Sequence, residues 1–138
     1  MARERVRTQS KKTAREQRAT YQTAVATQPK FKRVSRRQID AVVRKIVDEF
    51  NPEKIILFGS YAYGKPTIDS DVDVLVVMPS VERPAARAAQ VYKAVRGKPF
   101  PMDILVRTPQ EVAQRLAIGD FFFEEIIERG KIMYERLG

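Results

Sequence analysis

The 138-residue sequence contains no cysteine and no histidine. Without cysteine the chain can form neither disulfide bonds nor thiolate metal sites, and without histidine it has no imidazole for acid–base chemistry or metal ligation. These absences exclude serine and cysteine hydrolases that use a histidine base, and they exclude histidine-ligated zinc. A metal ion would have to be held by oxygen ligands, which favours Mg²⁺, Mn²⁺ or Ca²⁺.

Long hydrophobic runs are also missing. No segment approaches the roughly 20 apolar residues that a membrane-spanning helix needs, and no signal-peptide core follows the N-terminus. With 43% hydrophobic and 31% charged residues, the composition is that of an ordinary soluble protein. We therefore expect a cytoplasmic protein without membrane contact, with one folded domain and an extension.

Positive charge is distributed unevenly along the chain. Residues 1–37 hold 12 Lys and Arg against 2 acidic residues, whereas residues 38–138 hold 14 against 15. Residues 1–34 contain few large apolar side chains, so we expect a basic arm that is disordered or loosely helical. Such an arm could be a solvated extension, could contact nucleic acid non-specifically by neutralising phosphates, or could pack on an acidic partner. Residues 35–138 then form the folded domain.

The domain segment alternates between helix and strand patterns. Short apolar runs predict strands at residues 54–58, 72–78, 102–108 and 131–135. Helical spacing and helix-start residues, with Ser35 and Thr108 as N-caps, predict helices at residues 36–50, 84–96, 109–118 and 120–129. The order of elements predicts an α+β fold, a small mixed sheet with helices packed mainly on one side.

Acidic residues mark the start of two predicted strands. Asp71 and Asp73 are two residues apart at the start of strand 72–78, so their carboxylates point to the same face. Asp103 opens the neighbouring apolar strand. If the two strands pair, three carboxylates meet at the rim of the sheet and raise one another's pKa values unless a cation lies between them. The pattern predicts a site for one or two Mg²⁺ ions, or for Mn²⁺.

Gly59 and Ser60 follow the strand at residues 54–58. Because Gly59 has no side chain, backbone N–H groups and the Ser60 hydroxyl can approach a phosphate closely. Each signal alone is weak, since paired acids are often solvated strand ends and Gly-Ser is often a plain turn. Together they predict ATP or another nucleoside triphosphate as the ligand, with metal ions to activate an attacking hydroxyl and stabilise the pyrophosphate leaving group.

The stretch LFGSYAYGKPTIDSDVDVLVV, residues 57–77, resembles the signature of the polymerase-beta-type nucleotidyltransferases. That signature has a Gly-Ser after a strand, a spacer, Asp-x-Asp opening the next strand, and a third acidic residue on a later strand. The matching residues here are Gly59, Ser60, Asp71, Asp73 and Asp103. Over residues 36–135 the chain closely resembles the minimal nucleotidyltransferases, which often act beside a helical HEPN-type partner in toxin–antitoxin pairs.

The resemblance implies a polymerase-beta-like fold, Mg²⁺ dependence and transfer of a nucleoside monophosphate, most often AMP from ATP, to a hydroxyl. In some relatives the acceptor is a tyrosine of the HEPN-type toxin, which is thereby silenced. The resemblance assigns metal binding and catalysis to Asp71, Asp73 and Asp103, and binding of the phosphates to Gly59 and Ser60.

Tyr63 departs from the family pattern, because relatives often carry Arg at this position. Tyr63 could pack or line the site, and Lys65 could supply the missing cation, so both are candidates for nucleotide binding. A weakened nucleotide site leaves an alternative open, namely a binding module that acts as an antitoxin by direct contact with its partner. We expect the aromatic run at residues 121–123 to pack within a helix rather than to stack on a base.

Overall fold

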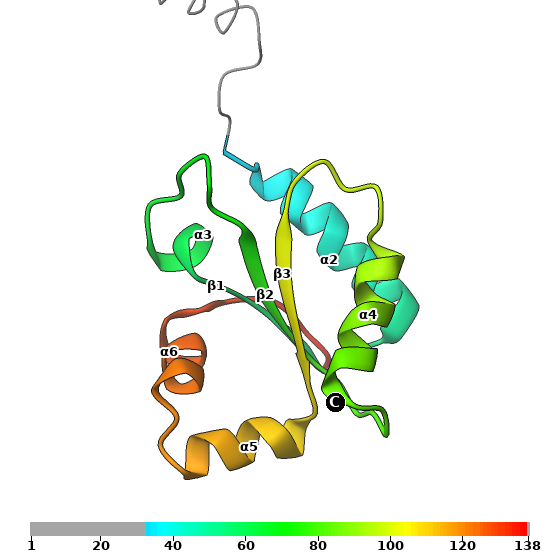
Figure 1. Ribbon diagram of the computed structural model, residues 1–138, viewed down its shortest axis with the longest axis vertical. Helices are drawn as coiled ribbons and strands as arrows, with labels where there is room; N and C mark the ends of the chain where they lie inside the picture. The colour runs from blue at the N-terminus through cyan, green and yellow to red at the C-terminus, as the bar shows by residue number, and fades with distance from the viewer. Residues whose placement is uncertain (1–32, 138) are drawn as a thin grey trace, which may run out of the picture. The chain divides into compact units, whose positions relative to one another are not determined.

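The computed structural model describes residues 33–137, so the predicted arm of residues 1–34 lies almost entirely outside the described residues. The described part is a four-stranded sheet with helices against both of its faces (Figure 1). In chain order the elements are α2 (Arg36–Phe50), β1 (Lys54–Phe58), α3 (Ser60–Tyr63), β2 (Val72–Val77), α4 (Pro84–Ala94), β3 (Met102–Arg107), α5 (Pro109–Ala117), α6 (Phe121–Arg129) and β4 (Lys131–Glu135). Within residues 33–137, no helix is both long enough and apolar enough to span a bilayer.

The sheet is mixed, as the sequence predicts, and has the strand order β3-β2-β1-β4. β1 pairs antiparallel with β2 and β4, whereas β2 and β3 run parallel. Asp73 is the register partner of Asp103 across the parallel pair and lies opposite Phe58 across the antiparallel pair. The start of β2, the start of β3 and the end of β1 therefore meet at one end of the sheet.

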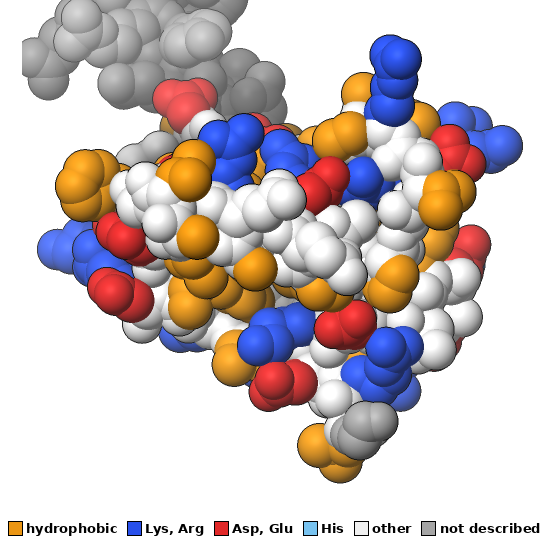
Figure 2. Space-filling model, turned by 90° about the horizontal axis from the view of Figure 1, so that it is seen from below, with side chains coloured by type: hydrophobic (Ala, Val, Ile, Leu, Met, Phe, Trp, Pro, Cys, Tyr) orange, Lys and Arg blue, Asp and Glu red, His pale blue; other side chains and the backbone are white. Residues whose placement is uncertain are grey.

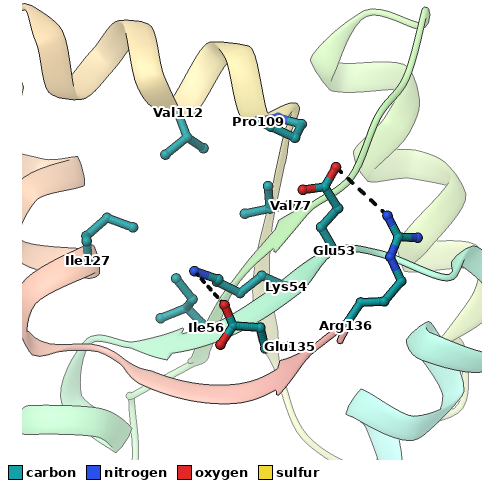
Figure 3. Close-up of a pocket in the computed structure, with 9 residues that line it drawn as sticks. All are labelled: Glu53, Lys54, Ile56, Val77, Pro109, Val112, Ile127, Glu135 and Arg136. Atoms are coloured by element: carbon teal, nitrogen blue, oxygen red, sulfur yellow. Dashed lines mark ion pairs between the residues drawn. The ribbon is translucent and has the colours of Figure 1, made fainter. Parts of the chain in front are cut away.

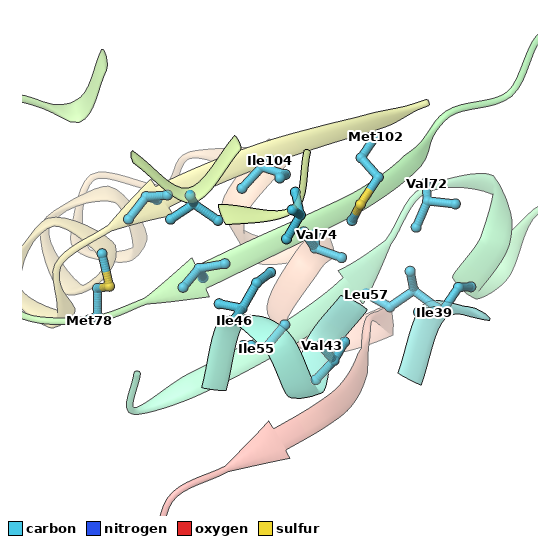
Figure 4. Close-up of a cluster of buried hydrophobic side chains, with 14 of the residues drawn as sticks. Ile39, Val43, Ile46, Ile55, Leu57, Val72, Val74, Met78, Met102 and Ile104 are labelled. Carbon is cyan, nitrogen blue, oxygen red and sulfur yellow. The ribbon is translucent and has the colours of Figure 1, made fainter. Parts of the chain in front are cut away.

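Two clusters of apolar side chains lie on opposite faces of the sheet. On the first face α2 and α4 cover Val72, Val74 and Val76 of β2, together with the facing residues of β1 and β3 (Figure 4). On the second face α5 and α6 cover Leu75 and Val77. The first cluster is the larger one, and to the expectation of helices mainly on one side the structure adds α5 and α6 on the second face. The physical reason is that the inner strands β1 and β2 bury consecutive residues and need cover on both faces.

Helix boundaries follow the capping residues found in the sequence. The hydroxyls of Ser35 and Thr108 each accept a hydrogen bond from the backbone N–H three residues later, and Gln38 and Glu111 complete the two capping boxes. Pro109 occupies the first turn of α5, where its missing N–H costs nothing. The predicted starts of α2 and α5 are therefore confirmed with their mechanism.

A buried ion pair joins α4 to α5 near the end of β3. Arg87 is only 4% exposed, and its guanidinium donates to both carboxylate oxygens of Glu111, at 2.6 and 3.1 Å. It also donates to the backbone carbonyls of Glu82 and Val106. The hydrogen bonds from Arg87 are the main reason why the pKa of Glu111 falls from 4.5 to about 2. A charge that would be costly to bury alone is thereby fully paired.

Glu111→Gln is expected to lower the free energy of unfolding at pH 7 by about 2 to 4 kcal/mol, because Arg87 stays buried without its counter-ion. The pKa of Glu111 is lower in the folded than in the unfolded chain, so the stabilisation is complete above pH 4.5 and is lost as the pH falls towards 2. Urea unfolding at pH 7 and pH 3 measures both effects. The variant should lose less stability over this interval than the wild type.

Glu49→Gln is the matched control, since it removes an exposed ion pair with Lys45 whose N–O distance is 3.3 Å. An exposed pair of this kind contributes little, about 0.5 kcal/mol or less. Equal losses of unfolding free energy in Glu111→Gln and Glu49→Gln would contradict the structural role assigned to the buried pair of Arg87 and Glu111.

The end of the domain that carries α5 shows apolar side chains interspersed with charges of both signs (Figure 2). Interspersed charges produce no strong field of one sign at this end. β2 and β3 begin at the opposite end of the sheet, away from α5 (Figure 1).

Candidate active site

Gly59 forms the turn between β1 and the short helix α3. Its φ is 72°, in the left-handed region that favours glycine. A Cβ atom at this position would collide with the carboxylate of Asp73. Gly59 is therefore required both by its backbone conformation and by the close approach of this acidic side chain.

The carbonyl of Gly59 accepts hydrogen bonds from the backbone N–H groups of Ala62 and Tyr63, at 3.0 Å each. These bonds connect the helix α3 to the turn. Ser60 and Tyr61 lie in the first turn, where helical N–H groups have no partner within the helix. These groups directly follow Gly59, the residue that the Asp73 carboxylate approaches. The Ser60 hydroxyl and the N–H groups can donate hydrogen bonds to an anion. A cation could in turn join that anion to the nearby carboxylates.

The three predicted acidic residues lie at one end of the sheet. Asp73 and Asp103 are register partners on parallel strands, where the backbones are about 4.8 Å apart. Strand alternation places both on the second face, with Leu75 and Val77. Asp71 lies two residues before Asp73, just ahead of β2; it and Asp103 are exposed, whereas Asp73 is half-buried.

The environment of Asp73 disfavours its charged form. Desolvation by burial is the main cause that raises its pKa from 3.8 to about 6, and the charges of Asp103 and Asp71 act in the same direction. A cation bound at this end of the sheet would remove that cost. The raised pKa of Asp73 therefore indicates a site that favours a positively charged ligand.

The donor set suits a hard divalent cation, because three carboxylates lie at one end of the sheet. As the side chains stand, no group of three or more acidic residues within the described part of the chain is gathered closely enough to hold a metal ion. Asp71, Asp73 and Asp103 are therefore neighbours that would have to turn towards one another to share an ion. Their assignment as metal ligands stays a prediction.

Tyr63 connects α3 to α6. Its hydroxyl donates to a carboxylate oxygen of Glu125 at 3.3 Å, and the guanidinium of Arg129 lies 4.5 Å from the centroid of its ring. Arg129 also pairs with Glu125 at 3.3 Å. Of the two roles that the sequence leaves open for Tyr63, these contacts favour packing, while Lys65 is exposed in the loop after α3.

Tyr61, on the same short helix, makes contacts on the first face of the sheet. Its hydroxyl accepts the backbone N–H of Val34 at 3.2 Å, and its ring packs against the larger apolar cluster. The two tyrosines of α3 therefore anchor this helix to opposite sides of the domain. That anchoring keeps Gly59 in place beside the carboxylate of Asp73.

The aromatic run at the start of α6 divides into two parts. Phe123 is 5% exposed within the second apolar cluster, which confirms the expected packing for this residue. Phe121 and Phe122 are 85% and 49% exposed, and Phe122 packs edge-to-face on Phe58 with ring centroids 5.6 Å apart. Sequence reasoning did not identify the contact of Phe122 with Phe58, the residue before Gly59. The sequence does contain a signal for this difference. Helical spacing places Phe123 and Ile126 on the buried face of α6, so Phe121 and Phe122 fall outside that face.

A cavity of about 510 Å³ lies between α5, α6 and β1, away from the carboxylates (Figure 3). Its apolar lining includes Ile56, Val77, Pro109, Val112 and Ile127. Two ion pairs border it, Lys54–Glu135 at 3.3 Å and Glu53–Arg136 at 3.9 Å. None of the predicted site residues lines this cavity, so the candidate active site is an open region at the sheet end and not this hollow.

Comparison with known proteins identifies the family. The family model described as "Nucleotidyltransferase domain" matches residues 22–132. The crystal structure of a candidate nucleotidyltransferase from Sulfolobus solfataricus is similar with a TM-score of 0.52 and 20% identity, covering 72% of this chain and 79% of that chain. A mutant of the toxin–antitoxin MntA–HpeT has a TM-score of 0.45 and 18% identity, covering 75% of each chain. No curated protein matches the chain.

The Sulfolobus structure supports the fold, and the family match extends over most of the chain. That match begins inside the predicted arm of residues 1–34, so the boundary between arm and domain stays a prediction. It includes Gly59, Ser60 and the three aspartates whose placement is given above. As the resemblance of residues 57–77 predicts, the chain belongs to the nucleotidyltransferase domain family and is a nucleotidyltransferase.

Proposed function

We propose that this nucleotidyltransferase moves AMP from ATP onto a hydroxyl group in a Mg²⁺-dependent reaction. The single observation that carries the proposal is the register pairing of Asp73 with Asp103 beside Gly59. It brings acidic side chains and a turn open to phosphate to one end of the sheet. A reaction of this class depends mainly on positioning and charge neutralisation: the turn would position the phosphates, and the acidic side chains would hold the metal ion that neutralises their charge.

Asp71, Asp73 and Asp103 would hold one or two Mg²⁺ ions, with Mn²⁺ as a substitute. When bound, the metal supplies charge neutralisation at the phosphates and lowers the pKa of a coordinated hydroxyl. The Ser60 hydroxyl and the first-turn N–H groups of α3 would bind the β- and γ-phosphates. Gly59 keeps the approach to Asp73 open.

In the transfer, the acceptor oxygen forms a bond to the α-phosphorus of ATP, and the bond from that phosphorus to the bridging oxygen breaks. Pyrophosphate leaves, and the hydroxyl proton passes to a base. Asp103 is suited to receive it, because β3 is an edge strand and the Asp103 side chain is exposed at the start of that strand. An acceptor can therefore reach this carboxylate from solvent.

The acceptor that we propose is a tyrosine of a helical HEPN-type partner, which gives the chain an antitoxin role. The support is the resemblance of residues 36–135 to the minimal nucleotidyltransferases. The described residues also form one small domain around a single sheet, and this domain includes no further module to grip a primer or a tRNA. Contact between the basic arm and nucleic acid stays a separate prediction, outside the described residues.

Isotope transfer tests this function. The full chain is incubated with Mg²⁺, a purified HEPN-type partner, and ATP labelled at either the α- or the γ-phosphate. Label from the α-phosphate alone is expected on the partner, and Asp103→Asn should reduce it by about 10²-fold or more. Asp69→Asn, in the exposed loop before β2, is the control that should transfer normally. Label from the γ-phosphate, or no label with the wild type, would refute the proposal.

A second function, neutralisation of the partner by contact alone, is favoured by one observation. The three carboxylates are not gathered closely enough to hold an ion as the side chains stand. Under this alternative, Asp103→Asn protein still rescues cells that express the partner, although no label is transferred. Loss of rescue together with loss of label would decide for the enzyme.

A further inference from the structure

We propose that the exposed aromatic side chains at the start of α6 bind the nucleobase of the substrate, with Phe122 as the stacking surface. This inference rests on the proposed function, because it assigns the base end of the ligand whose phosphates lie at Gly59 and Ser60. The expected base is a purine that carries an amino group.

The position of Phe122 links it to the phosphate region. Its ring packs on Phe58 with a centroid distance of 5.6 Å and an interplanar angle of 86°. Phe58 directly precedes Gly59 and lies opposite Asp73 in the sheet. A nucleotide with its phosphates at the turn can therefore extend along this side of the sheet towards α6 without leaving the protein surface.

The exposure of these rings makes them available for stacking. Phe121 and Phe122 are 85% and 49% exposed, whereas the core-facing ring of the same run, Phe123, is 5% exposed. Two adjacent exposed phenyl groups are unfavourable in water and are commonly part of a binding surface. A hollow of about 440 Å³, ample for a base, adjoins them; its lining is Phe121, Phe122, Glu124, Glu125, Glu128 and Arg129.

Two polar residues beside the hollow, Glu125 and Arg129, are held in position, and the carboxylates around it favour one class of base. Glu125 and Arg129 follow Phe122 at helical spacing and lie on the same side of α6. Their contacts with the Tyr63 hydroxyl and ring fix this side against α3. Ionised glutamates only accept hydrogen bonds, so the three in the hollow favour a base with an exocyclic amino donor, as in adenine, over uracil. A purine also offers the larger stacking area.

A side chain from a partner protein is the competing occupant of this surface. The ring of Phe122 packs on Phe58, which directly precedes Gly59. The aromatic surface is therefore continuous with the turn at which the phosphates would bind, and this continuity favours the base over a side chain of a partner. The experiment therefore separates the base from the phosphates. It measures the affinity of the full chain for ATP, UTP and inorganic tripolyphosphate in the presence of Mg²⁺ by titration calorimetry.

Wild-type protein should bind ATP more tightly than UTP. Phe122→Leu should weaken ATP binding by about 10-fold while leaving the affinity for tripolyphosphate unchanged, and Phe122→Trp should restore ATP binding. Ile118→Ala is the control, because Ile118 is 72% exposed at the end of α5 and lies outside the hollow. Thermal unfolding confirms that each variant is folded.

Equal losses for ATP and tripolyphosphate in Phe122→Leu would overturn the inference, since they would indicate a disturbed phosphate region. Unchanged ATP affinity would also overturn it, and reduced labelling of the partner in that case would assign the surface to protein docking. The proposed function would survive both results. If the wild type binds neither ATP nor tripolyphosphate, the proposed function itself fails.

Discussion

Asp73→Asn is expected to reduce nucleotide transfer by about 10³-fold or more while making the folded domain more stable at pH 8. Activity falls because the half-buried member of the three carboxylates loses its charge, and with it the attraction for a divalent ion. Stability rises because the same charge is unfavourable when no cation is bound. Loss of activity combined with gain in stability distinguishes a functional residue from a structural one.

The pH dependence follows from the direction of the shift. The pKa of Asp73 is about 6 in the folded protein against 3.8 ordinarily, so the folded state binds this proton more tightly. The contribution of Asp73 to stability is therefore fully present below pH 3.8 and is lost as the pH rises through 6. Asn does not ionise, so the variant should gain about 1 kcal/mol at pH 8 and nothing at pH 4, after allowance for solvent screening.

Urea unfolding at pH 8 and pH 4, with and without Mg²⁺, measures these effects. Mg²⁺ should raise the unfolding midpoint of the wild type at pH 8 and not that of Asp73→Asn, because the proposed site needs the Asp73 charge to hold the ion. Asp48→Asn, an exposed acid on α2, is the control and should change neither activity nor stability. Retained transfer in Asp73→Asn, or lower stability at pH 8, would contradict the role assigned to this residue.

Gly59→Ala is expected to reduce transfer by about 10²-fold and to lower the free energy of unfolding by about 1 to 3 kcal/mol. The stability loss has two causes: alanine is strained at φ 72°, and its Cβ collides with the carboxylate of Asp73. That carboxylate must move aside, which is the reason for the loss of activity. Transfer kinetics and urea unfolding of the same preparation measure both.

Gly119→Ala is the matched control. Gly119 has φ 76°, and nothing lies within 4 Å of an added Cβ, so this change introduces the backbone strain without a collision. Gly119→Ala should lower the free energy of unfolding by about 1 kcal/mol and leave the rate of nucleotide transfer unchanged. In an Asp73→Ala background, Gly59→Ala should cost only as much as Gly119→Ala does. Strictly additive losses for Gly59→Ala and Asp73→Ala would show that the two sites are not in contact.

Local signals in the sequence predict most of the elements correctly. Ser35 with Gln38 and Thr108 with Pro109 satisfy the helix N-termini by interactions within a few residues, so these starts are readable without a structure. The same is true of the short apolar strands, including β4 at residues 131–135. The site motif is equally local, since Gly59, Ser60 and the paired aspartates are recognised by their spacing.

Other features depend on contacts between distant segments. The pairing of Asp73 with Asp103 requires the parallel register of β2 and β3, which no local pattern specifies. The cover on the second face follows from how α5 and α6 pack on the sheet, which the sequence pattern does not specify. The contacts of Tyr63 with α6, and of Phe122 with Phe58, also join residues far apart in the chain.

The amino-acid sequence alone determined the elements, the family and the identity of the acidic residues, because capping, periodicity and motif spacing act over a few positions. Only the tertiary structure decided which face each acid occupies, that the three carboxylates stand near one another without yet surrounding one point, and that an aromatic surface adjoins the glycine turn. These depend on strand register and helix packing, whose free energies are sums over the whole core and belong to no single stretch of sequence.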